Sequence, residues 1–227
     1  MTHVLLFRLQ APMQAWGVQS YFGVRDTARF PTRSGMIGLL CAALGLPREA
    51  DLSEFEPLRF GVRVDRPGVM MRDFQAAQDI YLSEGKTTNN ATIGNRYYLA
   101  DAVFLAGIES EDLEQLARYQ SALKNPKWLL YLGRRAFPAA NPVWLQEGLQ
   151  EQATLERALQ TFPFLLSEES RLTSDHLQLA LEADSGTIVQ RDRPISFEAR
   201  TYVQRRLQVF LTPVPDRSLM EVEHVPE

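Results

Sequence analysis

The sequence has few of the residues that build disulfides, metal centres and acid–base catalysts. It contains one cysteine, Cys41, and three histidines among 227 residues. One cysteine excludes an internal disulfide framework and any zinc or iron–sulfur site that needs several cysteines. The histidines, His3, His176 and His224, accompany no serine or cysteine nucleophile motif. Phosphate-binding loops, hydrolase elbows and zinc-protease motifs are also missing, so the residues indicate no common catalytic class and call for no cofactor or metal.

Long apolar runs are missing as well. No stretch approaches the roughly 20 apolar residues that a membrane-spanning helix requires. The segment 1–8 lacks the basic leader and small-residue cleavage site of a secretory signal. Hydrophobic residues make up 45% and charged residues 23% of the chain, as in ordinary globular proteins. We therefore expect a cytoplasmic protein with one large domain or two small ones, not bound to a membrane.

Lysine is scarce, because only 3 of the 24 basic residues are lysines. Arginine grips phosphate with a planar two-bond fork and stacks on bases, although a GC-rich genome or a thermophile would show the same bias. The net charge of −4 argues against a general binder of nucleic acid. Basic residues nevertheless cluster in 1–48, 118–135 and 191–206, while 145–184 is acidic. Such segregation allows a basic surface on an acidic protein.

Hydrophobic periodicity predicts an α+β fold of the ferredoxin-like kind, from the order of strands and helices. The predicted strands cover 3–9, 58–65, 99–107, 177–183 and 203–211, and the predicted helices cover 34–46, 111–123 and 151–161. Ser110 is the expected N-cap of the second helix. The polar stretch 83–96, which includes Lys86 and Arg96, has little to bury and is typical of a loop or hairpin tip.

The segment 11–38 contains the first candidate binding site. Its arginines come just before a predicted helix start, where free N–H groups and the helix dipole favour phosphate. Threonine and serine there serve as caps or phosphate donors, and glycine permits close approach of the backbone. The residues of this candidate phosphate cradle are Arg25, Arg29, Thr32, Arg33, Ser34 and Gly35. The alternative is a surface loop whose serine caps a core helix.

Aromatic residues interleave with these arginines. Trp16, Tyr21, Phe22 and Phe30 lie in the same segment, and rings beside cations suit single-stranded RNA, whose bases stack while arginines hold the backbone. Core packing is the alternative for each ring. In the second basic block, Gly133 permits a tight turn that would project Arg134 and Arg135. The alternative there is a solvated arginine pair.

Several short sequence words resemble those of the CasD family, a subunit of the type I-E CRISPR surveillance complex, Cascade. The words are Pro12-Met-Gln-Ala-Trp-Gly17, Arg29-Phe-Pro-Thr-Arg-Ser-Gly35, Tyr131-Leu-Gly-Arg-Arg-Ala-Phe-Pro138, Glu168-Glu-Ser170, Arg191-Asp-Arg-Pro194 and Phe197-Glu-Ala-Arg200. Their order and spacing fit over nearly the whole chain.

The resemblance implies a single RAMP-type domain over 1–227, a modified ferredoxin-like or RNA-recognition-motif fold. It also implies a protruding β-hairpin, the thumb, inserted at about 79–100. Family members bind the 5′ handle of the guide RNA (crRNA), contact the CasC backbone and the large subunit CasA, and meet target DNA through the assembled complex. The implied function is therefore non-catalytic. The alternative is a metal-independent endoribonuclease of CRISPR repeats using Tyr97, Tyr98 and Lys86.

Overall fold

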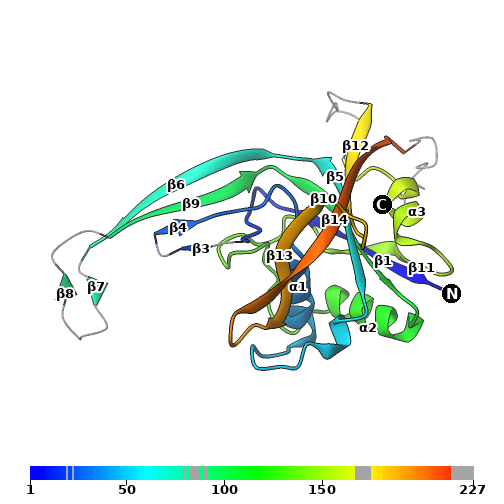
Figure 1. Ribbon diagram of the computed structural model, residues 1–227, viewed down its shortest axis with the longest axis horizontal. Helices are drawn as coiled ribbons and strands as arrows, with labels where there is room; N and C mark the ends of the chain where they lie inside the picture. The colour runs from blue at the N-terminus through cyan, green and yellow to red at the C-terminus, as the bar shows by residue number, and fades with distance from the viewer. Residues whose placement is uncertain are drawn as a thin grey trace, which may run out of the picture.

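A seven-stranded antiparallel sheet forms the centre of the computed structural model (Figure 1). The described residues are 1–18, 20–21, 23–78, 80–81, 87–88, 92–166 and 175–215. In spatial order the strands are β11 (Trp144–Gln150), β1 (His3–Gln10), β10 (Val103–Ser110), β5 (Arg59–Arg66), β12 (His176–Glu182), β14 (Thr201–Pro213) and β13 (Ile188–Ser196). The predicted α+β class is confirmed, and most strand pairs join segments distant in sequence.

Helices cover both faces of this sheet. The first hydrophobic cluster joins α1 (Arg33–Leu44) and α2 (Leu113–Lys124) to one face, and the second joins α3 (Leu155–Thr161) to the other. In β1, Leu5 and Phe7 belong to the first cluster, whereas Val4 and Leu6 belong to the second. Because both faces of β1 are buried, the strand has an unbroken apolar run rather than an alternating one. None of the helices in the described ranges is long and apolar enough to cross a bilayer.

The local signals at α1 explain the agreement with the predicted helix over 34–46. Thr32 is the N-cap, and its hydroxyl accepts a hydrogen bond of 3.2 Å from the Gly35 N–H. Gly45 ends the helix with φ of 73°, in the left-handed region that glycine adopts at little cost. Seven residues of α1 are buried, which fits a helix that is apolar nearly all round.

The other two helices start later than predicted. Asp112, not Ser110, is the N-cap of α2, because the Asp112 carboxylate accepts from the Gln115 N–H at 3.0 Å. Ser110 instead accepts from the Asp112 N–H at 3.1 Å, just outside the helix. The third helix begins at Leu155 after the N-cap Thr154, since the preceding residues end β11 and turn.

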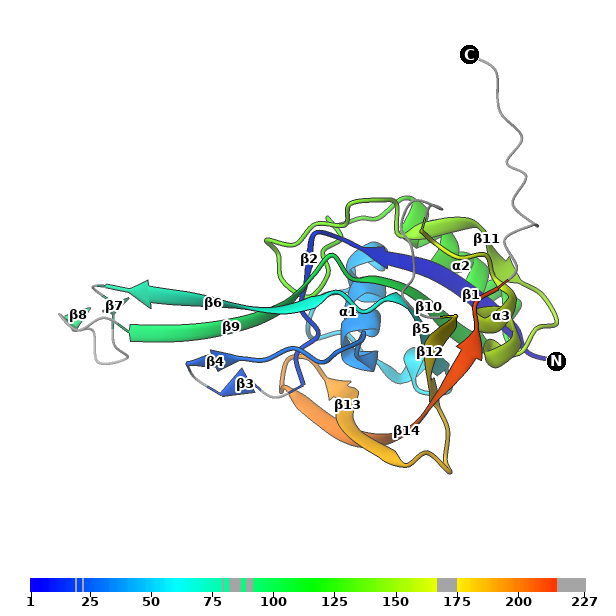
Figure 2. The ribbon, with the colours of Figure 1, turned by 90° about the horizontal axis from the view of Figure 1, so that it is seen from above.

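A long hairpin projects from the body of the molecule (Figures 1 and 2). Its strands, β6 (Val69–Ala77) and β9 (Thr92–Ala100), pair antiparallel from Val69↔Ala100 to Ala77↔Thr92. Short strands from the N-terminal segment widen its base: β2 (Met13–Gln14) pairs antiparallel with β9, and β4 (Val24–Arg25) pairs parallel with it. The remaining elements are β3 (Ser20–Tyr21), which pairs with β4, the β7 (Ile80–Tyr81)–β8 (Thr87–Thr88) pair, and η1 (Ser53–Phe55).

The segment 99–107, predicted as one strand, belongs to two strands. It crosses the boundary between β9 and β10, where Asp101 has a φ of 56° and reverses the chain. The apolar residues on both sides of this turn resemble one continuous strand in sequence. The predictions over 3–9, 58–65, 177–183 and 203–211 correspond to β1, β5, β12 and β14, while β6, β11 and β13 were not predicted.

Candidate nucleic-acid interface

Two arginines from distant segments lie side by side at the base of the hairpin. The parallel pairing of β4 with β9 sets Arg25 beside Arg96, and both side chains are exposed. Asp73 of β6 lies opposite Arg96 on the other side of β9. Residues paired directly across strands share a face of the sheet, so these charges lie on one surface.

Arg134 completes this group from a third segment. Its Nη2 donates to the carbonyl oxygens of Tyr97 at 2.7 Å and Arg25 at 3.4 Å, and its guanidinium lies 5.4 Å from the Phe137 ring centre. Burial lowers the pKa of Arg134. The charges of Arg96 and Arg25 lower it further, whereas those of Asp73 and Asp26 raise it. We call Arg25, Arg96 and Arg134 the hairpin-base arginines. An anion placed among them would offset their mutual repulsion.

Gly133 holds the loop that carries Arg134 and Arg135. Its φ is +90°, and a Cβ atom there would overlap the carbonyl oxygen of Ala15. The Ala15 N–H also donates to Leu132 O at 3.1 Å, so the loop rests directly on the N-terminal segment. Arg134 is half-buried under these contacts, whereas Arg135 is exposed. The tight turn predicted from Gly133 is therefore present.

A groove lined by aromatic rings lies beside α1 and reaches the same loop. Its volume is about 590 Å³. The aromatic lining comprises Trp128, Tyr131, Phe197 and Tyr202, and the N-terminal turn of α1 and the loop contribute Ser34, Gly35 and Gly133. Trp128 is 50% exposed and Tyr131 is 40% exposed, so their rings are accessible to a ligand. We call this cavity the aromatic groove.

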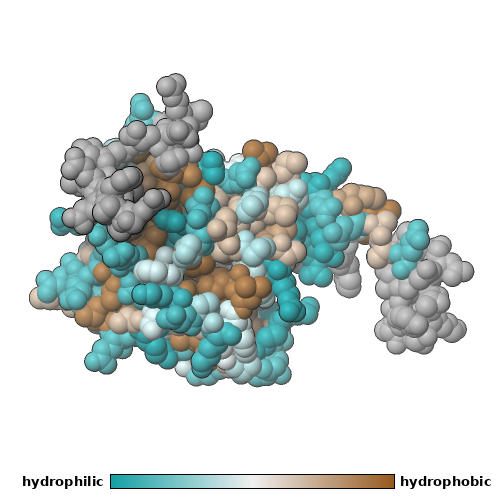
Figure 3. Space-filling model, turned by 180° about the vertical axis from the view of Figure 1, so that it is seen from behind, coloured by the Kyte–Doolittle hydropathy of each residue, from teal (hydrophilic) through white to brown (hydrophobic). Residues whose placement is uncertain are grey.

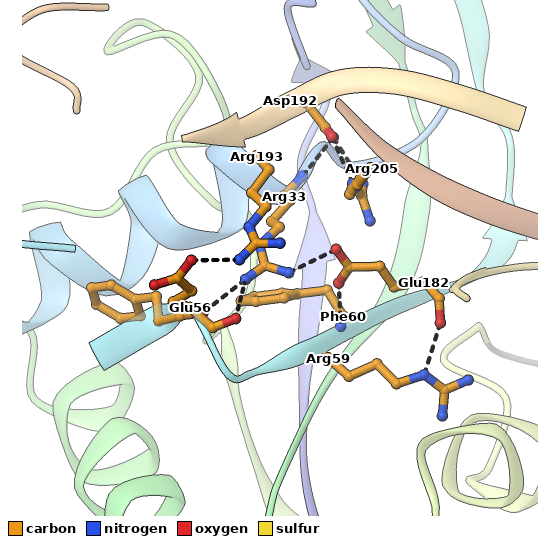
Figure 4. Close-up of polar contacts among 9 residues, drawn as sticks. Arg33, Glu56, Arg59, Phe60, Glu182, Asp192, Arg193 and Arg205 are labelled. Carbon is orange, nitrogen blue, oxygen red and sulfur yellow. Dashed lines mark hydrogen bonds and ion pairs between the residues drawn. The ribbon is translucent and has the colours of Figure 1, made fainter. Parts of the chain in front are cut away.

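Arg33 does not belong to this surface, which corrects the predicted cradle. Its side chain is 3% exposed, and its Nη1 donates to Glu182 Oε1 at 2.7 Å. Its Nη2 donates to the carbonyl oxygens of Phe55 and Glu56, and its guanidinium lies 4.7 Å from the centre of the Phe60 ring (Figure 4). These contacts engage the guanidinium inside the protein, away from Arg25, Arg96 and Arg134.

Trp16 and Thr32 are also internal, contrary to the predicted roles in stacking and phosphate binding. Trp16 is 1% exposed, and its indole N–H donates to Gln14 Oε1 at 3.2 Å. A Cβ atom on Gly35 would lie 2.7 Å from the Trp16 ring, so this glycine lets α1 pack against the ring. Thr32 is 1% exposed and is used as the helix cap.

The other predicted site residues are spread over the surface. Arg29 is exposed and Ser34 is half-buried. Phe30 packs partly buried against the first hydrophobic cluster. Lys86 and Phe22 lie outside the described residues, and the side chain of Tyr21 is not described.

The projecting hairpin presents a different surface from its base. Beyond Arg96, its exposed apolar residues include Phe74 and Ile93, which are 59% and 53% exposed. Figure 3 shows brown, apolar surface on the projection beyond the teal, hydrophilic surface nearer the body. The arginines therefore mark the base of the hairpin.

Comparison with known proteins identifies this architecture. Residues 4–209 match the family model described as CRISPR-associated protein (Cas_Cas5). The chain belongs to this Cas5 family. It is 32% identical to the CRISPR system Cascade subunit CasD of Escherichia coli (strain K12), over 92% of this chain and 96% of that protein.

Two solved structures of similar proteins agree with this membership. One, described as a crystal structure of a Cas protein, is 40% identical, with a TM-score of 0.76 over 94% of this chain and 98% of that one. The other comes from a CRISPR RNA-guided surveillance complex and is 34% identical, with a TM-score of 0.74 over 93% and 91% of the two chains. The mixed, mostly antiparallel architecture is thus shared with other Cas proteins.

In this Cas5-family chain, the candidate catalytic tyrosines Tyr97 and Tyr98 lie half-buried on β9. The Tyr98 ring packs 5.9 Å from the Phe137 ring, and the Tyr97 carbonyl accepts from Arg134. Among the described residues, no group of three or more His, Cys, Asp or Glu side chains is placed to hold a metal ion. These contacts tie both tyrosines to the arginine-bearing loop.

The sequence reasoning missed the four rings of the aromatic groove. Trp128 and Tyr131 lie within the basic block 118–135, so the combination of rings and cations sought in residues 11–38 also occurs there. Phe197 and Tyr202 flank the turn between β13 and β14. Only the three-dimensional fold brings this turn to α1.

Proposed function

We propose that this chain is a CasD-type subunit of a CRISPR Cascade complex, in which it binds guide RNA. Family membership and 32% identity to a Cascade subunit support the assignment. The observation that carries RNA binding is the meeting of Arg25, Arg96 and Arg134 from three separate segments. When the fold gathers cations from separate segments and places aromatic rings near them, the surface can bind the phosphates and the bases of a single strand. Scattered, solvated charges cannot do this.

The contacts that this surface offers need neither a metal nor a titrating acid. Arg25 and Arg96 expose their side chains to phosphate oxygens, and the main chain of the 131–138 loop offers further contacts. Trp128 and Tyr131 expose ring faces on which bases stack, each worth about 1–3 kcal/mol in single-strand binding. Arg135 and Arg29 would extend the path of the RNA strand along the protein surface. The phosphates would set the position of the RNA and the groove would receive its bases.

The partners follow from the same proposal. The RNA segment is the 5′ handle of the crRNA, and the protein neighbours are CasC-type backbone subunits and a CasA-type large subunit. Target DNA would be met only through the assembled complex, in the cytoplasm. The fold is then a single RAMP-type, modified ferredoxin-like domain over 1–227. Its thumb would be the β6–β9 hairpin, whose described strands begin at Val69, before the expected range of about 79–100.

The proposed role is non-catalytic. The endoribonuclease alternative needs an acid and a base free to move protons, whereas the Tyr98 ring packs against Phe137 and none of the three histidines of the chain belongs to β9. Incubating the purified chain with labelled repeat RNA in EDTA tests this point. Uncut RNA is the expected result. Specific cleavage that disappears in Tyr97→Phe would establish the alternative.

RNA binding itself is tested by removing both exposed hairpin-base arginines. Each phosphate contact on a single strand contributes a slope of about −0.7 to log K against log salt. Arg25→Ala with Arg96→Ala should therefore flatten the slope by about 1.4 and weaken guide-RNA binding. Fluorescence anisotropy at several salt concentrations measures both quantities, with thermal melting in parallel.

The matched control removes two exposed arginines elsewhere, Arg118→Ala with Arg157→Ala. It lowers the net charge equally but should leave the slope unchanged. Equal slopes in the two double variants would show that the hairpin base makes no phosphate contacts. If that hairpin-base variant does not fold, Arg25→Gln with Arg96→Gln replaces it, because glutamine removes the charge but keeps more of the side chain than alanine does.

A further inference from the structure

A second large pocket lies on the curled ribbon formed by β13 and β14. It has a volume of about 550 Å³. Five arginines line it, together with three carboxylates and Gln204: Arg33, Arg59, Arg193, Arg205, Arg206, Glu56, Glu182 and Asp184. We call it the arginine pocket. It shares no lining residue with the aromatic groove, so it is a separate site on the described surface.

Its inner wall is built from buried charged side chains. Arg205 is 5% exposed, and its Nε and Nη2 donate to the two oxygens of Asp192 at 2.6 and 2.8 Å. Asp192 also accepts from the Arg33 N–H at 2.8 Å. Figure 4 shows the third guanidinium nitrogen of Arg205 directed away from Asp192. The wall is therefore rigid and presents donors in fixed positions.

The outer wall adds donors that are only lightly engaged. Arg193 donates to Glu56 at 2.8 Å with its side chain 33% exposed, and the exposed Arg206 makes a long contact of 3.3 Å to Gly186 O. Both oxygens of Glu182 are already occupied, by Arg33 and by the Phe60 N–H. The pocket thus offers more free donors than free acceptors.

The arginines of the pocket also act on one another. Burial lowers the pKa of Arg33 despite its pairing with Glu182, and the charges of Arg193 and Arg205 lower it further. An incoming carboxylate would accept from Arg193, Arg205 or Arg206 and offset their repulsion.

From this arrangement we infer that the arginine pocket binds carboxylates on an acidic segment of a neighbouring protein subunit. The inference rests on the proposed function, because that function places the chain in a multi-subunit complex. RNA is the less suitable occupant, since none of the described residues that line the pocket is aromatic and a base would find no ring to stack on.

Binding of a fluorescein-labelled hexaglutamate peptide to the full chain tests the inference. Arg206→Glu is the informative variant, because Arg206 is exposed and makes a single long contact. We expect it to weaken hexaglutamate binding at least ten-fold. Arg157→Glu, an exposed site outside the pocket, should bind the peptide like the wild type. Hexaglutamine serves as the uncharged probe and should not bind.

Guide-RNA affinity, measured on the same variants, separates this inference from the proposed function. Unchanged RNA affinity in Arg206→Glu, with hexaglutamate binding lost, is the expected pattern. Absent hexaglutamate binding by the wild type, equal binding in Arg206→Glu, or a ten-fold loss of RNA affinity in that variant would each overturn the pocket assignment. Failure of the wild type to bind guide RNA would instead overturn the proposed function.

Discussion

The internal and the hairpin-base arginines have the same chemistry but opposite surroundings. Arg63 is fully buried between Asp65 and carbonyl oxygens in the last turn of α3 and the segment that follows it, and Arg33 is nearly as enclosed. Arg25 and Arg96 are exposed and lie beside each other, with Asp73 opposite Arg96. An internal arginine has its partners supplied by the fold, whereas the exposed pair is left for a ligand. The partners, not the residue type, therefore indicate the role.

The strongest test of the internal class is Arg63→Ala. It leaves Asp65 charged and buried, with carbonyl oxygens of Leu159 and Pro163 unpaired. Removing one partner of a buried ion pair costs about 3–5 kcal/mol, so the free energy of unfolding should fall by that amount. Denaturant unfolding measures it. A loss below about 1 kcal/mol would mean that water reaches this pair.

Arg33→Met should have the next largest effect, about 2–3 kcal/mol. Glu182 loses its guanidinium partner but keeps the Phe60 N–H and is 13% exposed, so its desolvation is less complete than that of Asp65. The salt slope of guide-RNA binding should stay unchanged, because Arg33 is internal. A salt slope flattened by about 0.7 would show that Arg33 contacts an RNA phosphate, and it would contradict the distinction between internal and exposed arginines.

Burial in the interior also shifts the pKa of the Cys41 thiol. Burial raises the pKa of Cys41 to about 12 from 9.0, with a smaller contribution from the Glu54 charge. The unfolded chain therefore loses this proton first, and stability falls as the pH rises from about 9 towards 12. At pH 10 the loss is about 1.4 kcal/mol relative to pH 7. Comparing unfolding of the wild type and Cys41→Ala at both pH values isolates it, since other groups titrate equally in both proteins.

Arg118→Ala should have the smallest effect. Arg118 donates to Glu54, but its side chain is 54% exposed and that of Glu54 is 29% exposed. Exposed ion pairs contribute about 0–1 kcal/mol, so the melting temperature should hardly move. A shift as large as that of Arg33→Met would show that exposure does not separate the two classes.

The sequence predicted those elements whose signals are local. Thr32 and Gly45 bound α1 through contacts within a few residues, and the alternating residues of β5 mark that strand. Local signals mislead where two are adjacent, as with Ser110 and Asp112 at the start of α2. A single left-handed residue, Asp101, is also enough to divide an apolar run into β9 and β10.

The candidate site was harder to predict because its assembly is non-local. Arg25 meets Arg96 only through a parallel strand pair, and Phe197 reaches α1 only through the curl of β13 and β14. Arg33 looked like a surface cation because its acceptor, Glu182, lies 149 residues further along the chain. Composition and spacing record the cations but not which of them the fold will neutralise.

The hydrogen bond from the Arg33 N–H to Asp192 also has a consequence for synthesis on the ribosome. Its partners are 159 residues apart in the chain. At about 5–20 residues per second, roughly 8–32 s pass between translation of the two. During that interval the first turn of α1 lacks its distant carboxylate, and Arg33 lacks Glu182. The nascent N-terminal half must therefore wait for the last third of the chain before these contacts can form.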